Sequence, residues 1–219
     1  MHNTVQNLIE IENKIKSNLS DLAINNLPKI IAVSKTFKIE QILPLIDYGH
    51  INFGENKVQE ATEKWTKIKT GNSKIKLHMI GKLQTNKVKF AVKLFDYIHS
   101  VDSEKLAKKI ADEQAKINKN IKIFIQVNIG DENQKSGIVI SQLKKLVTYC
   151  KEINLEILGL MCIPPSNIDS SSYFKKMYLL NNDFNFLELS MGMSSDYLQA
   201  SQNSATFLRI GSSIFGSRS

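Results

Sequence analysis

The sequence is poor in cysteine and histidine, and neither residue type is grouped as a metal or redox centre requires. The two cysteines, Cys150 and Cys162, have neither the spacing of metal ligands nor that of a redox motif. We therefore expect both to be free thiols in a reducing compartment. The four histidines are scattered along the chain: His2, His50, His78 and His99. The sequence thus offers no cluster of metal ligands.

Long apolar runs are also missing. No run approaches the roughly 20 residues that a membrane-spanning helix needs. The opening residues, MHNTVQNLIEIENKIKSNLS, lack the basic start and apolar stretch of a secretory signal. We expect a cytoplasmic protein without a membrane partner.

Arginine is scarce although the net charge is +8, because only Arg209 and Arg218 are present and the other basic residues are lysines. The lysines are spread through the predicted helices, mostly on solvent faces and without interleaved aromatic residues. This distribution argues against a specific nucleic-acid partner and allows only weak, non-specific association. The scarcity also makes Arg209, which lies inside an apolar run, worth attention.

Eight short apolar runs alternate with helical patterns. The runs are IIAVS, INFG, LHMIG, YIHSV, IKIFIQVNI, LEILGLM, FLELSMG and TFLRIG. Continuous Ile, Val and Leu runs are typical of parallel strands buried on both faces, and alternation with helices predicts right-handed βαβ units. Eight units favour an α/β fold of the (β/α)8 TIM-barrel type over 29–219, preceded by an amphipathic N-terminal helix over 1–26. An open doubly wound sheet is the alternative, but no GxGxxG follows the first run. Without a linker or composition break, we expect a single domain over 1–219.

Side chains that follow the strands of a parallel barrel gather at one mouth. The stretch KIIAVSKTF places Lys35 just after the first strand, and GENKVQE places Asn56 after the second. A lysine at a strand end is most often simply reaching solvent. The alternative is that Lys35 acts at the mouth of a site as a nucleophile or a charge anchor.

The loops after the last two strands, SMGMSSD and RIGSS, predict an anion site. Gly211 and Ser212 offer backbone amides and a hydroxyl ahead of a short helix. Arg209 stands between Leu208 and Ile210, so it faces the barrel interior if those neighbours face the helices. A structural ion pair is the other interpretation of this arginine. A lysine, a phosphate site and an arginine at one mouth suit a phosphorylated aldehyde cofactor held as an imine.

Motifs in the same order extend along almost the whole chain, from about Leu8 to Arg218. They are AVSKT (32–36), FGENKVQE (53–60), HMIGKLQTNK (78–87), SVDS (100–103), QVNI with QKSG, GLMCIPP, LSMGMSSD and RIGSSIFG. With these motifs the chain resembles the pyridoxal phosphate homeostasis protein family, the single-domain relatives of the alanine racemase N-terminal barrel.

The resemblance implies that Lys35 carries pyridoxal 5′-phosphate (PLP) as an internal aldimine. It implies that Asn56 lines the cofactor and that Arg209 faces the pyridine nitrogen. The residues that it implies for the phosphate are Ser194, Gly211 and Ser212. The chain departs from the family where Phe, Ala and Thr are more usual, at Met79, Cys162 and Ser212. Ser212 keeps a hydroxyl and an amide, so phosphate binding should survive.

The function expected is PLP homeostasis, in which the protein buffers or carries the cofactor without catalytic turnover. An arginine at the pyridine nitrogen leaves the ring a poor electron sink, and a racemase needs acid–base groups on both faces of its substrate. Related racemases take the second group, a tyrosine, from a second domain, and no residues remain here for one. A small amino-acid racemase is the alternative, and a Schiff-base aldolase a more distant one. The expected partners are PLP and PLP-dependent apoenzymes as recipients, and the expected assembly is a monomer or weak dimer.

Overall fold

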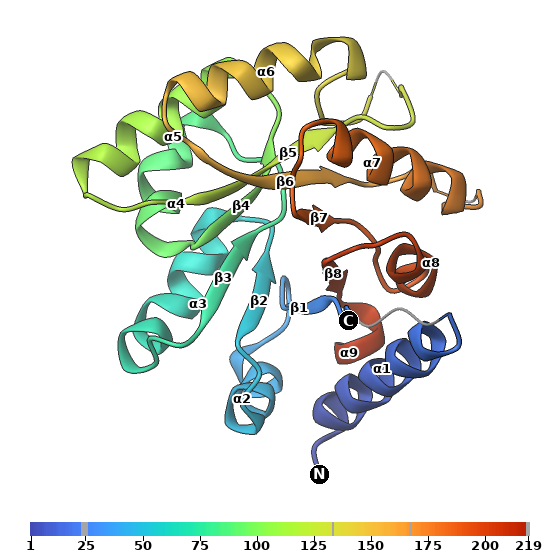
Figure 1. Ribbon diagram of the computed structural model, residues 1–219. Helices are drawn as coiled ribbons and strands as arrows, with labels where there is room; N and C mark the ends of the chain where they lie inside the picture. Colours follow the sequence, from blue (N-terminus) through green and yellow to red (C-terminus); the bar gives the residue numbers. More distant parts are fainter. Residues whose placement is uncertain (23–25, 133, 167, 218–219) are drawn as a thin grey trace.

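Residues 1–22, 26–132, 134–166 and 168–217 are described by the structure, which is a computed structural model. Eight parallel strands pair in sequence order and close through β1 and β8 into a barrel (Figure 1). The strands are β1 (Lys29–Val33), β2 (Asn52–Glu55), β3 (Lys76–Met79), β4 (Tyr97–Val101), β5 (Lys122–Val127), β6 (Glu156–Cys162), β7 (Glu188–Ser190) and β8 (Phe207–Ile210). The predicted (β/α)8 barrel is confirmed, and the open sheet is excluded.

Helices surround the strands on the outside of the barrel (Figure 1). They are α1 (Asn3–Ser20), α2 (Ile39–Tyr48), α3 (Val58–Gly71), the short 3-10 helix η1 (Thr85–Lys87), α4 (Val88–Leu94), α5 (Glu104–Lys116), α6 (Ile140–Glu152), α7 (Ser171–Asp183), α8 (Tyr197–Gln202) and α9 (Ser212–Phe215). Among the described residues, no helix is long and apolar enough to cross a membrane.

The N-terminal helix exists but is shorter than the predicted 1–26. α1 ends at Ser20, where the Asp21 N–H bonds back to carbonyls of the last turn. Its buried stripe stops at Leu19, and Leu22, which continues the apolar spacing, is 50% exposed. α1 packs against α2, α8 and α9, and the Asn7 amide donates to the Ile214 carbonyl at 2.9 Å.

Parts of three predictions lie outside the described residues. They are residues 23–25 of the predicted helix, residues 218–219 of the predicted barrel, and Arg218.

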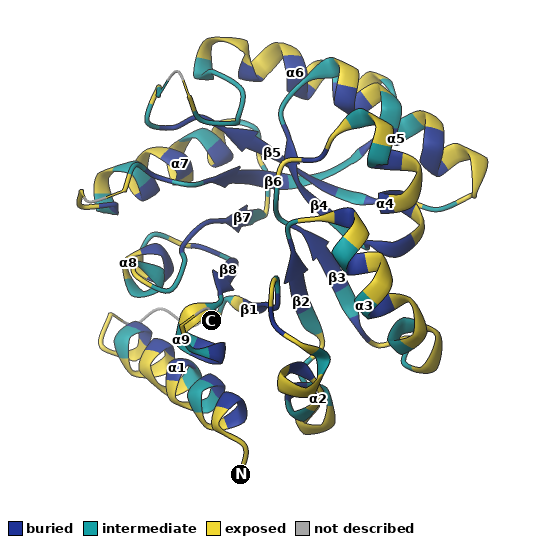
Figure 2. Ribbon diagram, turned by 180° about the vertical axis from the view of Figure 1, so that it is seen from behind, coloured by how far each residue is buried: buried dark blue, intermediate teal, exposed yellow. Residues whose placement is uncertain are grey.

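The core has two layers, as expected for a barrel. Most buried apolar side chains lie between the strands and the helices, and Figure 2 shows the strands and inward helix faces as buried. A smaller cluster has as its buried members Ile31, Phe124, Met161 and Phe207. Inward and outward side chains alternate along each strand, so Leu208 and Ile210 join the outer layer.

Both cysteines are buried and form no disulfide in the described structure. Burial raises the pKa of each thiol, Cys150 and Cys162, to about 12, so neither is a reactive thiolate at neutral pH. The described residues hold no group of three or more potential metal ligands.

Candidate cofactor site

A cavity of about 410 Å³ lies beyond the carboxyl ends of the strands. All six residues predicted for the site line it: Lys35, Asn56, Ser194, Arg209, Gly211 and Ser212. They come from loops or ends of β1, β2, β7 and β8, so the closure of the barrel brings together residues up to 177 positions apart (212 minus 35). The structure therefore assembles the predicted set at one place.

Lys35 follows β1 at a sharp change of chain direction. Its side chain is half-buried at the cavity, and the next residue, Thr36, has a φ of 69°, in the left-handed region. A β-branched residue rarely adopts that conformation, so neighbouring contacts must hold it. The Thr36 N–H donates to the Glu60 carboxylate at 2.6 Å, which supplies such a contact.

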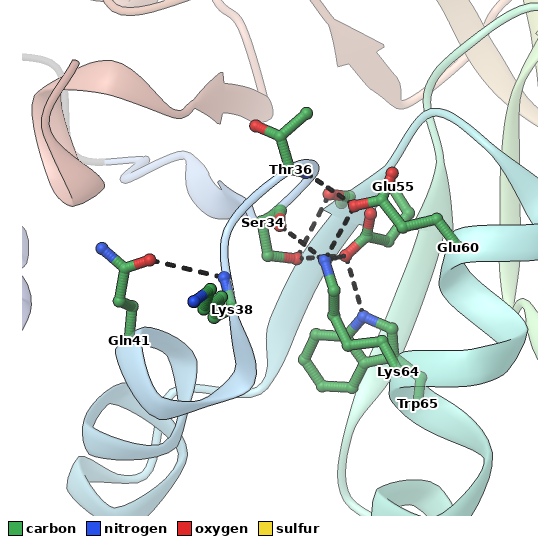
Figure 3. Close-up of polar contacts among 9 residues, drawn as sticks. Ser34, Thr36, Lys38, Gln41, Glu55, Glu60, Lys64 and Trp65 are labelled. Carbon is green, nitrogen blue, oxygen red and sulfur yellow. Dashed lines mark hydrogen bonds and ion pairs between the residues drawn. The ribbon is translucent and has the colours of Figure 1, made fainter. Parts of the chain in front are cut away.

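A buried ion-pair network holds Ser34, the residue before Lys35. Lys64 Nζ donates to the Ser34 carbonyl at 2.8 Å and to Glu55 and Glu60, each at 3.0 Å. The Ser34 hydroxyl and the Trp65 indole N–H also donate to Glu55, at 2.8 and 2.9 Å. Figure 3 shows Lys64 between the two carboxylates and the Ser34 backbone.

Hydrogen bonds favour the ionised form of Glu60 in this network. Burial raises the pKa of the Glu60 carboxyl, but the Thr36 N–H and the Lys64 ammonium outweigh burial and lower the pKa below its usual value. Glu60 therefore stays ionised and anchors Thr36, while Lys64 anchors Ser34. Both backbone neighbours of Lys35 are held, which fixes the position from which its side chain enters the cavity.

Arg209 enters the cavity from inside the barrel, where its side chain is 4% exposed. Nη1 donates to the Ser190 hydroxyl and Nη2 to the Cys162 carbonyl, both at 2.8 Å. Burial lowers the pKa of the guanidinium, but an arginine remains charged at neutral pH. Its partners are neutral, so the ion-pair interpretation of this arginine is not what the described residues show.

Ser194 links the two loops that were predicted to bind an anion. Its hydroxyl accepts from the backbone amides of Gly211 and Ser213, both at 3.3 Å. Gly192, in the same loop, has a φ of 88°, and a Cβ there would lie 2.5 Å from the Ala200 side chain, so glycine is required. The loop after β7 is thereby held against the start of α9.

Asn56, just after β2, also lines the cavity. Its Oδ1 is buried and has no hydrogen-bond partner among the residues that the structure describes. Gly81 packs so closely on it that a Cβ would come within 2.5 Å of the Asn56 carbonyl. A buried acceptor without a partner is costly, which points to a donor supplied by a ligand.

Sequence reasoning missed two polar groups behind the cavity. One is the Glu55–Lys64 ion pair. The other is a pair of fully buried histidines, His78 and His99, with Nδ1 of the first 2.9 Å from Nε2 of the second. A signal for the pair was available, since each histidine lies inside an apolar run and at a position that strand alternation turns inward.

Acid is expected to destabilise the fold through these histidines. Burial, and then neighbouring cationic groups, place the pKa of His78 and of His99 well below the usual 6.5. The unfolded chain therefore binds more protons below about pH 6.5, so stability is lost as the pH falls. We expect the free energy of unfolding to drop by up to about 1.4 kcal/mol per pH unit for each imidazole.

Urea unfolding at pH 7.5, 6.5 and 5.5 checks this, because in that range the carboxyl groups with lowered pKa values stay ionised in both states. A constant free energy of unfolding across the three pH values would contradict the neutral, buried state of the pair.

Comparison with known proteins identifies the family of this chain. Residues 11–219 match the family model for the alanine racemase N-terminal domain. The pyridoxal phosphate homeostasis protein of Aquifex aeolicus (strain VF5) is 37% identical over 203 residues, which cover 88% of each chain. The chain belongs to the pyridoxal phosphate homeostasis protein family. The family member of Escherichia coli (strain K12) is 32% identical and covers 100% of this chain and 98% of its own.

Solved structures agree with this assignment. The structure of PipY from Synechococcus elongatus PCC7942 with PLP bound has a TM-score of 0.81 and 31% identity, covering 92% of this chain and 100% of PipY. Alanine racemase of Clostridium difficile 630 has a TM-score of 0.75 at 13% identity, and this chain covers 56% of it. The second likeness is one of fold alone.

Proposed function

We propose that this chain binds PLP in the 410 Å³ cavity and serves PLP homeostasis by buffering or carrying the cofactor. One observation carries the proposal. The six residues that the motifs single out line a single cavity, in a chain that is 31% identical to a protein whose structure has PLP bound.

Unpaired polar groups support the fit of a ligand with both donors and acceptors. Within the part of the chain that the structure describes, Asn56 Oδ1 has no donor and Arg209 uses two N–H groups. A guanidinium has five N–H donors, so three remain for an acceptor in the cavity. We propose that Arg209 faces the pyridine nitrogen and that Ser194, Gly211 and Ser212 hold the phosphate.

Lys35 supplies the covalent attachment in this proposal. Its amine would hold the cofactor covalently through the aldehyde carbon, with the loss of one water. PLP would supply an electron-withdrawing ring, and Arg209 beside the ring nitrogen would disfavour its protonation and so weaken the ring as an electron sink. The site is then suited to holding the aldehyde.

We propose that the protein does not turn over amino acids. Among the described residues that line the cavity, Lys35 and Arg209 alone carry titratable side chains. A racemase needs a second acid–base group opposite the lysine. Incubation of the PLP-loaded protein with L-alanine in deuterated water tests this. We expect no α-proton exchange above that of free PLP, whereas exchange that is lost in Lys35→Ala would favour the racemase alternative.

The proposal also covers the location, recipients, domain organisation and assembly of the protein. We propose a cytoplasmic location, PLP-dependent apoenzymes as recipients, a single domain over 1–219, and a monomer or weak dimer. The packing of α1 against α2, α8 and α9 supports the single domain.

The phosphate contacts predict a selective defect in Ser194→Ala. The change removes the hydroxyl that accepts from the Gly211 and Ser213 amides, so the two loops lose two hydrogen bonds and keep the 3.5 Å contact of Ser213 Oγ with the Ser194 carbonyl. We expect affinity for PLP to fall about tenfold and affinity for pyridoxal, which has no phosphate, to change far less. Fluorescence titrations with both ligands measure this. Equal losses for the two would place the phosphate elsewhere.

A further inference from the structure

Four polar contacts run in series through the barrel interior, from Arg209 to Asn52. Arg209 Nη1 lies 2.8 Å from Ser190 Oγ, which lies 2.8 Å from His99 Nδ1. His99 Nε2 lies 2.9 Å from His78 Nδ1, and His78 Nε2 lies 3.1 Å from Asn52 Oδ1. The three middle side chains, from β7, β4 and β3, are fully buried.

The direction of each hydrogen bond follows from the arginine end. A guanidinium can only donate, so Ser190 Oγ accepts from Arg209. His99 Nδ1 is then the one acceptor left for the Ser190 hydroxyl proton among its described partners. A buried hydroxyl without an acceptor would be costly, so Ser190 donates to His99.

The positions of the imidazole protons on His99 and His78 then follow. With Nδ1 accepting, a neutral His99 carries its proton on Nε2 and donates to His78 Nδ1. His78 likewise carries its proton on Nε2 and donates to Asn52, whose Oδ1 is the atom placed to accept it. The far end of the series thus agrees independently with the direction that Arg209 imposes.

We propose that Ser190, His99 and His78 are positioning residues that hold the Arg209 guanidinium toward the cavity through a one-way chain of hydrogen bonds. Both imidazoles are neutral, with the proton on Nε2. This inference rests on the proposed function, because it assigns these residues to the arginine that we place beside the PLP ring nitrogen.

Each terminal nitrogen of the Arg209 guanidinium has its own acceptor, Ser190 at the start of the hydrogen-bonded series and the Cys162 carbonyl. One N–H of Nη1 goes to Ser190 and one of Nη2 goes to Cys162. With both nitrogens held, the guanidinium plane cannot rotate about its own axis, and its other N–H groups keep a fixed direction. Hydrogen bonds that point the same way also polarise one another, which strengthens the one made by Arg209.

The surroundings keep the two rings uncharged. His99 faces Arg209 and His78, and His78 also faces His50, Lys29 and Lys69, all of which disfavour a second proton. Stacked aromatic rings cover both imidazoles, Tyr97 on His78 and Phe124 on His99, each with centroids 4.3 Å apart. Both imidazoles are fully buried, and no carboxylate contacts either ring among the described residues.

Nitrogen-15 NMR of the protein without added PLP tests the proton positions directly. Long-range proton–nitrogen spectra of the side chains distinguish the two neutral tautomers and the imidazolium. We expect His78 and His99 both to show the neutral form protonated on Nε2, unchanged between pH 7.5 and 5.5. An Nδ1 proton on either ring, or titration in that range, would overturn the one-way chain.

Ser190→Ala tests the coupling to Arg209, with Tyr97→Phe as the matched control that touches His78 without joining the chain. In Ser190→Ala we expect PLP affinity to fall about tenfold, because Arg209 Nη1 loses its acceptor, while His78 keeps its Nε2 proton on Asn52. We expect Tyr97→Phe to alter affinity less than about twofold. Normal PLP affinity in Ser190→Ala would overturn the positioning role. If wild-type protein fails to bind PLP, the proposed function fails, and the NMR result still decides the proton positions.

Discussion

Replacement of Lys35 by alanine is expected to abolish covalent attachment of PLP while leaving the barrel folded. The side chain stands half-buried at the cavity, outside the apolar core, so its loss opens no buried cavity. We expect the free energy of unfolding to change by about 1 kcal/mol or less. The Schiff-base absorbance of wild-type protein with added PLP should be absent, and only weaker, non-covalent binding should remain.

Lys82→Ala is the matched control for that change. Lys82 is an exposed lysine that lines a neighbouring cavity, and Asn56 lines that cavity too. The variant therefore removes the same charge close to the site. We expect it to keep the absorbance. A Lys35→Ala protein that still shows the band would contradict the assignment, and one that unfolds on purification would show that Lys35 has a structural role.

Replacement of Lys64 by methionine is expected to be the most destabilising single change at the site. The side chain is 10% exposed and Glu55 is fully buried, so the variant leaves a carboxylate without its cation inside the protein. The Ser34 hydroxyl and the Trp65 N–H would still donate to Glu55 Oε1, but both are neutral, and Oε2 has no partner among the described residues. Breaking a buried pair from one side costs about 3–5 kcal/mol, and urea unfolding at pH 7.5 should show a loss of this size.

Two further variants locate the cause of that loss. The double variant Glu55→Gln/Lys64→Met removes the buried negative charge as well and should recover part of the stability. Lys108→Met breaks the exposed Lys108–Asp112 pair, whose side chains are 63% and 48% exposed, and should cost less than about 1 kcal/mol. Similar losses for Lys64→Met and Lys108→Met would contradict a buried, charge-dependent network.

The barrel and the composition of the cavity could be predicted because both depend on local patterns. Apolar runs such as IIAVS give parallel strands, and residues that follow such strands meet at one mouth whatever lies between them. This is why Lys35 and Arg209, 174 positions apart (209 minus 35), could be placed together from sequence. The end of α1 was harder, because Leu22 continues the apolar spacing although it is 50% exposed in the structure.

The pairing of the polar groups behind the cavity could not be predicted, because it depends on register between elements. Glu55 meets Lys64 only because α3 packs on β2 with that face inward. His99 reaches Ser190 across the barrel interior, 91 positions along the chain, and no local pattern pairs them. The motifs identified the residues that line the cavity, whereas the residues that hold them in place required the three-dimensional structure.

The most direct test of PLP attachment is the mapping of the modified residue in wild-type protein. One equivalent of PLP is added, the visible absorbance is recorded, the mixture is reduced with borohydride, and the modified peptide is identified by mass spectrometry. We predict a Schiff-base band and a reduced adduct on Lys35 alone. The absence of a band, or a label scattered over many lysines, would mean that Lys35 is only a lysine where a strand reaches solvent, and would contradict the proposed function.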